Sequence, residues 1–420
     1  MITIMPGHPC FMLKTIRQIA YGDNMKVEFY IKKFGLENEV IKIRRHLHRI
    51  AELSGQEEKT AEYICSLLDS WGVNYTANVA GKGVVAVVKG AEDGKVVALR
   101  ADMDALPIEE ETRLPYASEE RGVMHACGHD AHTAILLGCC HIFSLIKEDL
   151  SGTVKFFFQP AEETTGGAER MIEQGCMTNP DVDYVVGLHV EPSLHTGMVG
   201  IRFGKMYAAS DMVDICIKGK GAHGAHPDEG IDTIVVAANI INTVQTVISR
   251  NLSPLESGVC TFGSIKGGTV RNQLADRTEL SGIIRSFDEN TRQQLRERIK
   301  LICEGIGKSM GARIDFNITE SYGPLINDDT VTSTVKNAAE RIFGKNNVVI
   351  EQEPDLSCED FSYFANMKPS CYFHLGCYDE KLGDKVDLHH PKFTVDENCL
   401  ILGVKIQVEN VISLLSLEEK

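Results

Sequence analysis

Four short apolar runs separated by helical stretches place the strongest limit on how this chain can fold. The runs are rich in β-branched and aromatic residues and cover residues 84–88, 96–101, 153–158 and 184–190. Segments whose apolar residues recur at helical spacing lie between several of them, including residues 131–146 and 167–174. Apolar strands that alternate with helices predict an α/β fold with a largely parallel sheet, covered on both faces.

Polar side chains collect where these predicted strands end. Asp102 and Asp104 follow the second run, Glu162 and Glu163 follow the third, and His189 closes the fourth. Ligands of such sheets bind beyond the carboxyl ends of the strands. We therefore expect the chemistry of this protein at that edge.

The pattern changes after residue 204. An alternating strand at 212–217, a helix at 232–249, two more strands and a helix at 289–307 form a β-α-β-β-α-β series. The 420 residues also exceed what one core usually supports. We predict a catalytic domain of residues 25–204 and 321–420, an inserted α+β satellite domain of residues 205–320, and an irregular N-terminal extension of residues 1–24.

Composition narrows the possible partners. The net charge of -16 repels phosphate backbones and anionic lipids, so we expect neither a nucleic acid nor a membrane partner. No run approaches the ~18 uninterrupted apolar residues of a membrane span. The 13 cysteines are odd in number and scattered, without a CxxC pair. Free thiols of this kind fit a reducing cytosol, which predicts a cytoplasmic protein.

The densest chemical motif is His-Ala-Cys-Gly-His-Asp-Ala-His at residues 125–132, directly before an apolar helical run. Asp130 is predicted to be the N-cap of that helix. Cys127 and His129 cannot share one helix face, so they would bind one site from the loop before the helix. Thiolate and imidazole suit several divalent transition metals. The motif alone also fits a buried cysteine beside surface histidines.

A second motif, Gln-Pro-Ala-Glu-Glu at residues 159–163, ends the third apolar run. Neighbouring side chains point apart, so one of Glu162 and Glu163 can bind a cation while the other takes a proton from water. His189 and the pair His389-His390 are further candidate donors. Each motif also has a plainer interpretation, such as an exposed acidic turn or a hydrogen-bonded core histidine. Four such sites together favour a metal centre.

Signatures of other enzyme classes are missing. The sequence has no HExxH helix, P-loop, GxSxG nucleophile elbow or zinc-deaminase pair. A GxGxxG string occurs at residues 219–224, but Pro227 and Gly230 delay the next helix until about Asp232. Because the string does not open that helix, it does not predict a dinucleotide site.

Taken together, the motifs resemble the aminoacylase/carboxypeptidase superfamily of two-metal amidohydrolases. Specifically, they resemble the branch of hippurate hydrolases, N-acyl-amino-acid amidohydrolases and plant auxin-conjugate hydrolases. It spans roughly residues 40–415 and rests on LRADMDALP, HACGHDAH, QPAEE, GLHV, GKGAHGAHP and LHHP. The resemblance implies two divalent ions (zinc, manganese, nickel or cobalt), a small N-acyl amino acid as substrate, and a satellite domain that commonly mediates homodimer formation.

The resemblance also implies roles in the catalytic domain. Cys127 would bridge the two ions, and the other ligands would be His129, Glu163, His189 and His389. We take His389 rather than His390 from the LHxP pattern. Glu162 would be the general base that later protonates the leaving amine, and Asp104 would orient a ligand.

Three satellite-domain residues match positions near the substrate. His223 would help to polarise the scissile carbonyl, in some relatives across the dimer, while Asn272 and Arg285 would line the pocket. On simpler grounds Asn272 could shape a turn and Arg285 could be an exposed strand cation. The sequence departs from the family pattern at Asp228 and Thr233, where relatives usually carry histidine and proline.

Two other functions remain open on sequence grounds. The chain could be a dipeptidase or carboxypeptidase of the same superfamily, or a non-catalytic relative that binds metal or a partner. A purely structural metal site is normally closed by four ligands. Such a structural site does not need an additional carboxylate like Glu162 beside it, so the presence of Glu162 favours the hypothesis of a catalytic hydrolase.

Overall fold

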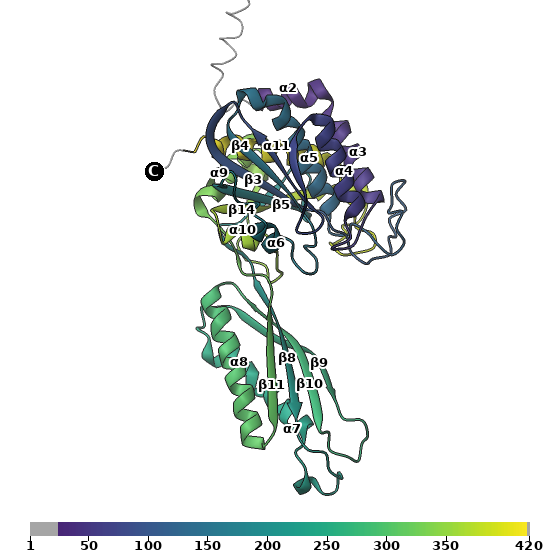
Figure 1. Cartoon of the computed structure of the whole chain (residues 1–420), viewed down its shortest axis with the longest axis vertical. Coiled ribbons are helices and arrows are strands. Elements are labelled where there is room, and N and C mark those ends of the chain that lie inside the picture. Colours follow the sequence, from purple (N-terminus) through teal and green to yellow (C-terminus); the bar gives the residue numbers. More distant parts are fainter. Residues whose placement is uncertain (1–23, 418–420) are drawn as a thin grey trace, which may run out of the picture. The chain divides into compact units, whose positions relative to one another are not determined.

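The computed structural model describes residues 24–417, so the predicted N-terminal extension lies outside the described residues apart from Asn24. The chain divides into two compact units (Figure 1). The larger contains residues 24–203, Asn327–Glu351 and 367–417, and the smaller contains Gly204–Ile326 and Gln352–Asn366.

Our expected boundaries placed Gly204 and residues 321–326 in the catalytic domain, whereas they belong to the smaller unit. The segment Gln352–Asn366 was also expected in the catalytic domain and also belongs to the smaller unit. It packs with the smaller unit because its backbone bonds to strand β7 (Gly204–Tyr207) and the residue after it. Asp355 N donates to Met206 O at 2.9 Å, and Ala208 N donates to Ser357 O at 3.0 Å. Pairing of this kind between distant segments has no local sequence signal.

The larger unit is built on an eight-stranded sheet with the order β1-β2-β4-β3-β5-β14-β6-β13. Strand β3 runs parallel to β4 and β5, β14 runs parallel to β5, and β13 runs parallel to β6. The predicted, largely parallel sheet is therefore confirmed. The strands are β1 (Asn74–Val79), β2 (Gly83–Lys89), β3 (Glu92–Asp102), β4 (Ser151–Gln159), β5 (Tyr184–His195), β6 (Val199–Ile201), β13 (Val348–Ile350) and β14 (Ser370–Tyr378).

Helices of the larger unit pack on this sheet and on one another. Helix α5 contacts α3, α11 and strand β3. It is apolar around most of its circumference and is accordingly buried along most of its length. The helices are α2 (Asn24–Phe34), α3 (Leu36–Arg49), α4 (Glu58–Trp71), α5 (His129–Ile146), α6 (Ala168–Glu173), α9 (Asp329–Phe343) and α11 (Asn398–Leu415).

Within the described residues, α11 is long and apolar enough to cross a membrane by length and composition. It is 61% buried, and it packs against α5 and β3. Leu400, Val404, Val408 and Val411 all lie in the hydrophobic core. A core helix satisfies the same criteria, so α11 gives only weak support for a membrane span.

The smaller unit confirms the predicted β-α-β-β-α-β series. Its antiparallel sheet has the order β11-β8-β10-β9, and α7 and α8 pack on it (Figure 1). The series is β8 (Ala209–Lys218), α7 (Thr233–Thr246), β9 (Gly258–Gly267), β10 (Arg277–Ser286), α8 (Glu289–Met310) and β11 (Arg313–Glu320). Two further elements are helix α10 (Ser362–Ala365) and strand β12 (Leu325–Asn327), which pairs with β7.

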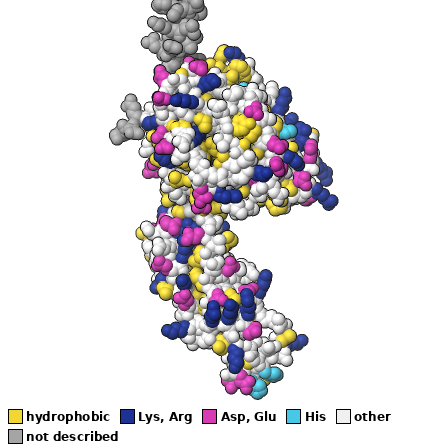
Figure 2. Space-filling view, viewed as in Figure 1, with side chains coloured by type: hydrophobic (Ala, Val, Ile, Leu, Met, Phe, Trp, Pro, Cys, Tyr) yellow, Lys and Arg dark blue, Asp and Glu magenta, His cyan; other side chains and the backbone are white. Residues whose placement is uncertain are grey.

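The distribution of charged side chains and of cysteines in the structure agrees with what the composition led us to expect. Figure 2 shows acidic and basic side chains interspersed on the face in view rather than gathered into one basic region. Each cysteine in the described ranges is a free thiol, and most of them are buried. Free buried cysteines act as small apolar residues of the core.

Candidate metal centre

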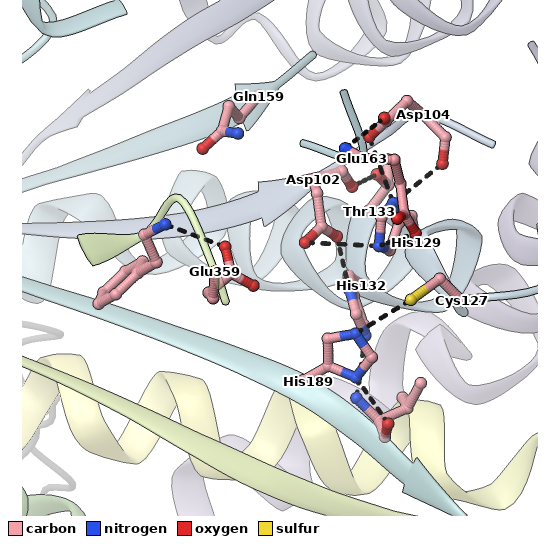
Figure 3. Close-up of polar contacts among 12 residues, drawn as sticks. Asp102, Asp104, Cys127, His129, His132, Thr133, Gln159, Glu163, His189 and Glu359 are labelled. Atoms are coloured by element: carbon pink, nitrogen blue, oxygen red, sulfur yellow. Dashed lines mark hydrogen bonds and ion pairs between the residues drawn. The ribbon is translucent and has the colours of Figure 1, made fainter. Parts of the chain in front are cut away.

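Four of the predicted donors of the larger unit, Cys127, His129, Glu163 and His189, come together in Figure 3, and His389 contacts Cys127 and Glu163. Cys127 precedes α5, and His129 is the first residue of that helix. Glu163 follows β4, His189 lies within β5, and His389 comes from the long segment before α11. Residues that are 262 positions apart thus share one site.

The sulfur, imidazole nitrogen and carboxylate oxygen atoms of these residues lie close enough to one another to bind the same cation. Cys127 Sγ is 3.4 Å from His189 Nε2 and 3.2 Å from His389 Nε2. Glu163 Oε1 is 3.3 Å from His389 Nε2 and 3.9 Å from His129 Nε2. Cys127 belongs both to a group with His129 and His189 and to a group with Glu163 and His389, each with its ligand atoms within 4.8 Å. Cys127 therefore lies between the two groups, as expected for the bridging ligand that the family resemblance implies.

Hydrogen bonds orient two of the imidazoles. His129 Nδ1 lies 2.9 Å from Asp104 O, and His189 Nδ1 lies 2.7 Å from Val190 O. A backbone carbonyl only accepts, so each Nδ1 carries a proton and Nε2 is the ring atom directed at the site that can bind a cation.

Two buried atoms at the centre of the site indicate what it can hold. In the described part of the chain, His129 Nε2 and Glu163 Oε1 are buried without a hydrogen-bond partner. Burying such groups unsatisfied costs about 1–3 kcal/mol each, and a cation would satisfy both. Sulfur, imidazole and carboxylate donors together suit zinc, cobalt, nickel or manganese. The residues present therefore fit divalent cations.

The electrostatics of the site favour added positive charge. The close contacts of His389 with Cys127 and with the Glu163 carboxylate raise the pKa of His389 to about 10. Burial raises the pKa of the Cys127 thiol, although the charge of His129 opposes this. Burial also lowers the pKa of His189 well below its usual value, and His132 adds to the effect. A neutral His189 is the form that can bind a cation.

Asp130 is not the helix N-cap, so that prediction was wrong. Helix α5 begins at His129, two residues earlier than an Asp130 N-cap would require, and its N-cap Gly128 is in the left-handed conformation with φ 85°. The Asp130 carboxylate is taken by two buried partners, since Arg44 Nε lies 2.7 Å away and His48 Nδ1 lies 2.8 Å away. Charged partners bind a carboxylate more strongly than backbone amides do. His129 consequently stands in the first turn of the helix rather than in the loop.

A buried chain of hydrogen bonds runs behind the donors, and sequence reasoning missed its role. Arg100 NH1 donates to Asp102 Oδ2 at 2.7 Å, and His132 Nδ1 donates to Asp102 Oδ1 at 2.6 Å. His132 Nε2 in turn accepts from Val190 N at 2.9 Å, directly after His189. Burial raises the pKa of Asp102, but its interactions with His129, Arg100 and His132 outweigh burial and leave that pKa well below the usual range. The only sequence sign of this supporting role is that His132 stands three residues after His129 in the motif His-Asp-Ala-His.

Asp104 supports two of the predicted ligands. Its Oδ2 accepts from Glu163 N at 3.0 Å and from Ser54 Oγ at 2.6 Å. Its Oδ1 lies 3.3 Å from His129 Nδ1. Burial raises the pKa of Asp104, while the bonds from His129, Ser54 and Glu163 bring it below the ordinary value. This geometry agrees with the orienting role implied by the resemblance.

Of the two adjacent histidines, His389 faces the donors. Its backbone adopts φ 62°, and its N–H donates to Ala126 O at 2.8 Å. Both histidines are exposed, but His390 makes a local contact instead, since its Nδ1 accepts from Lys392 N at 3.1 Å. The ring of His390 therefore serves a local turn.

The three remaining candidates lie in the smaller unit. His223 is exposed and accepts from Ala225 N at 3.1 Å, and Asn272 O accepts from Gly224 N at 2.8 Å. Histidine side chains gather at one tip of this unit in Figure 2. Arg285 lies near the far end of β10, opposite Ser210. At about 3.3 Å per strand residue, Asn272 and Arg285 are on the order of 25 Å or more apart, so one small ligand cannot contact both within one chain.

The α/β fold, with Cys, His and Glu side chains close together at one site, is that of an enzyme with a candidate metal centre. The model of Peptidase family M20/M25/M40 matches residues 98–411. An N-acetyl-L-cysteine deacetylase of Bacillus subtilis is 39% identical over 385 residues, covering 92% of this chain and 90% of that protein. Thermostable carboxypeptidase 1 of Saccharolobus solfataricus is 39% identical over 372 residues, covering 88% and 93%.

A solved structure agrees with these matches. The YXEP protein of Bacillus subtilis, a dinuclear metal-binding peptidase from the M20 family, has a TM-score of 0.79 and 33% identity, covering 91% of this chain and 99% of that one. The chain belongs to Peptidase family M20/M25/M40. It is a hydrolase of a family that contains amidohydrolases, deacetylases and carboxypeptidases.

Proposed function

We propose that the protein hydrolyses the amide bond of small N-acyl amino acids, such as N-acetyl or N-benzoyl derivatives, to a carboxylate and a free amino acid. One observation carries the proposal: Glu162 and Glu163 form a group with His129 whose ligand atoms lie within 4.8 Å. Two adjacent carboxylates can thus divide metal binding and proton transfer. The likeness to an N-acetyl-L-cysteine deacetylase supports this substrate class.

The chain's donors suit two divalent cations, which can be zinc, manganese, nickel or cobalt. Cys127 would be shared, and the remaining ligands would be His129, Glu163, His189 and His389. When bound, the cations would polarise the acyl carbonyl and lower the pKa of a water. Asp104 would keep His129 and Glu163 in place through the contacts described above.

Glu162 would move the proton during hydrolysis. It is 8% exposed, so little bulk water competes for its carboxylate. The hydroxyl part of a water adds to the acyl carbon while Glu162 takes the proton. The C–N bond then breaks, and the amine nitrogen receives that proton from Glu162. A positioned acid–base group of this kind contributes a factor of ~10²–10⁴ in rate.

The smaller unit would contact the substrate. His223 would bind the carbonyl oxygen, and Arg285 and Asn272 would hold the amino acid part. Among the described residues, Arg285 NH1 is buried and lacks a hydrogen-bond partner, which suits a substrate carboxylate. Because Asn272 and Arg285 of one chain cannot reach the same small ligand, a second copy would supply one of them. We therefore propose a homodimer. Because the cysteines of the described residues are free thiols, we also propose that the protein acts in the cytoplasm.

A pair of matched variants tests this mechanism. Glu162→Gln should retain the metal content of the wild type but lose ~10²–10⁴-fold in kcat on N-acetyl and N-benzoyl amino acids. Glu163→Gln, one residue away, should lose bound metal as well. Apo-protein would be reloaded separately with zinc, manganese, nickel and cobalt, and metal content and turnover measured. No turnover with any ion would overturn the proposed activity, and an active Glu162→Gln variant would remove Glu162 from the mechanism.

A carboxypeptidase or dipeptidase activity is the second candidate. The likeness to a thermostable carboxypeptidase supports it, since that relative matches equally well by identity. Comparing N-benzoylglycine with a free dipeptide and an N-blocked dipeptide separates the two functions. A kcat/KM at least tenfold higher on either peptide would favour this second candidate.

A further inference from the structure

Glu57 is a fully buried carboxylate of the larger unit that the site description has not used. It stands at the N-cap position of α4, at 0% exposure, but its side chain makes no cap hydrogen bond. Glu52 caps the helix instead, accepting from Lys59 N at 3.1 Å and from Thr60 N at 3.0 Å. A buried acid at a position where capping is already provided requires another partner.

That partner is the loop carrying the adjacent carboxylates. Glu57 Oε1 accepts from Ala161 N at 2.8 Å, across 104 positions of sequence. Ala161 has φ 59°, in the left-handed region, and is 1% exposed. An L-residue there is less stable by about 1–2 kcal/mol than in a right-handed conformation, so surrounding contacts must hold it.

The conformation of Ala161 sets the direction of the two residues that follow. Its carbonyl accepts from Gly166 N at 2.9 Å, which closes the loop on its other side. Asp104 Oδ2 accepts from Glu163 N at 3.0 Å. Two buried carboxylates therefore hold the amides of residues 161 and 163 and flank Glu162 between them. If Ala161 returned to an extended conformation, Glu162 and Glu163 would leave the donor group.

We propose that Glu57 is a positioning residue that holds Ala161 in its left-handed conformation and thereby directs Glu162 and Glu163 into the metal centre. The inference rests on the proposed function, since it explains how that site is kept in shape. The contact of Glu57 with this loop is made by one oxygen, which accepts from Ala161 N, so the length of the side chain decides whether the contact forms. Its negative charge is not what the loop requires.

Two substitutions distinguish the effect of the length of the Glu57 side chain from the effect of its negative charge. Glu57→Gln keeps an oxygen at the same distance and removes the charge, so kcat and metal affinity should stay within about threefold of wild type. Glu57→Asp keeps the charge and withdraws the oxygen by one methylene, so both should fall ~10–100-fold, the usual effect of losing a residue that supports a metal ligand. KM should change little. Glu52→Asp is the matched control, because it shortens the neighbouring helix cap without touching the loop, and it should retain kcat.

Amide exchange gives a readout that does not depend on activity. In peptides covering residues 160–163, the Ala161 amide should exchange at least tenfold faster in Glu57→Asp than in wild type, Glu57→Gln or Glu52→Asp. The inference fails if Glu57→Gln behaves like Glu57→Asp, if Glu57→Asp exchanges and binds metal like wild type, or if Glu52→Asp loses as much kcat. A wild type that cleaves no N-acyl amino acid overturns the proposed function alone, since exchange and metal affinity still decide the role of Glu57.

Discussion

Gly128 lies between the candidate ligands Cys127 and His129, and Gly128→Ala is the sharpest test of how tightly that motif is built. Gly128 has φ 85°, in the left-handed region that glycine adopts readily. A Cβ added there would lie far inside van der Waals contact with Val190 Cγ2 and 3.6 Å from Phe393 Cε1. Val190 is fully buried and follows His189, so any shift also disturbs that donor.

Two separable costs make up the expected loss. Placing an L-residue in the left-handed region costs about 1–2 kcal/mol. Forcing an extra methyl group against a packed core costs a further ~1–3 kcal/mol. Gly128→Ala should therefore lower the free energy of unfolding of the larger unit by about 2–5 kcal/mol. The control is Gly35→Ala, at φ 64° with nothing within 4 Å of the added Cβ, which should show the first cost alone.

The assay uses the single tryptophan, Trp71, which lies in the larger unit. Urea unfolding followed by its fluorescence reports that unit even if the two units unfold separately. At an m-value of about 3 kcal/mol/M, the expected loss shifts the midpoint by roughly 1 M urea.

A double-mutant cycle tests the steric part of this argument. Val190→Ala removes the methyl group that the new Cβ would meet, so the double variant should be more stable than the two single losses predict, by about 1–3 kcal/mol. Equal losses in Gly128→Ala and Gly35→Ala, or a cycle without coupling, would refute the steric reasoning. A Gly128→Ala protein with undiminished metal affinity would refute the tie to the donors.

Four further predictions concern the metal centre and the smaller unit, two for each. Removing metal with a chelator should lower the Trp71 unfolding midpoint, since a cation at 100 times its Kd stabilises the folded unit by about 2.7 kcal/mol; an unchanged midpoint would contradict a cation site. His132→Ala removes the acceptor of Val190 N and should weaken metal binding ~10–100-fold in a competition titration, whereas wild-type affinity would contradict its support of His189. Asp211, at 1% exposure, lies 2.7 Å from Arg292 and 2.6 Å from Arg296, so Asp211→Ala should destabilise the smaller unit by ~3–5 kcal/mol without moving the Trp71 transition. Burial raises the pKa of Asp211, but the two arginines outweigh burial and bring the pKa below its ordinary value. The stabilisation of the smaller unit by the ionised Asp211 is therefore present above the ordinary carboxyl range and is lost as the pH falls through the folded pKa. Calorimetry from pH 7 down to 3 would show it, and an Asp211→Asn variant with the same acid loss would contradict it.

The elements were predictable because their signals are local. Continuous apolar runs marked β2, β3, β4 and β5, and alternation followed by helical spacing marked the series from β8 to β11. The N-cap assignment failed because Asp130 has an equally local interpretation as a cap, while Arg44 and His48 approach it from α3, more than 80 positions away. The segment 352–366 was misplaced for the same reason, as its partner strand β7 lies about 150 positions earlier.

In the candidate site, the metal-donor residues were likewise predictable from local motifs, whereas the residues that hold them in place were not. Cys127, His129 and Glu163 lie in motifs whose residue types point to metal chemistry by themselves. Glu57 stands in the string Gln-Glu-Glu-Lys, which reads as an ordinary exposed acidic helix start, and only its contact with Ala161 shows otherwise. Ala161 likewise gives no sequence sign of its left-handed backbone, because glycine or asparagine is the residue expected there. An unusual backbone conformation at an unremarkable residue requires a distant group to hold it, so Glu57 and Ala161 should be altered and interpreted as a pair.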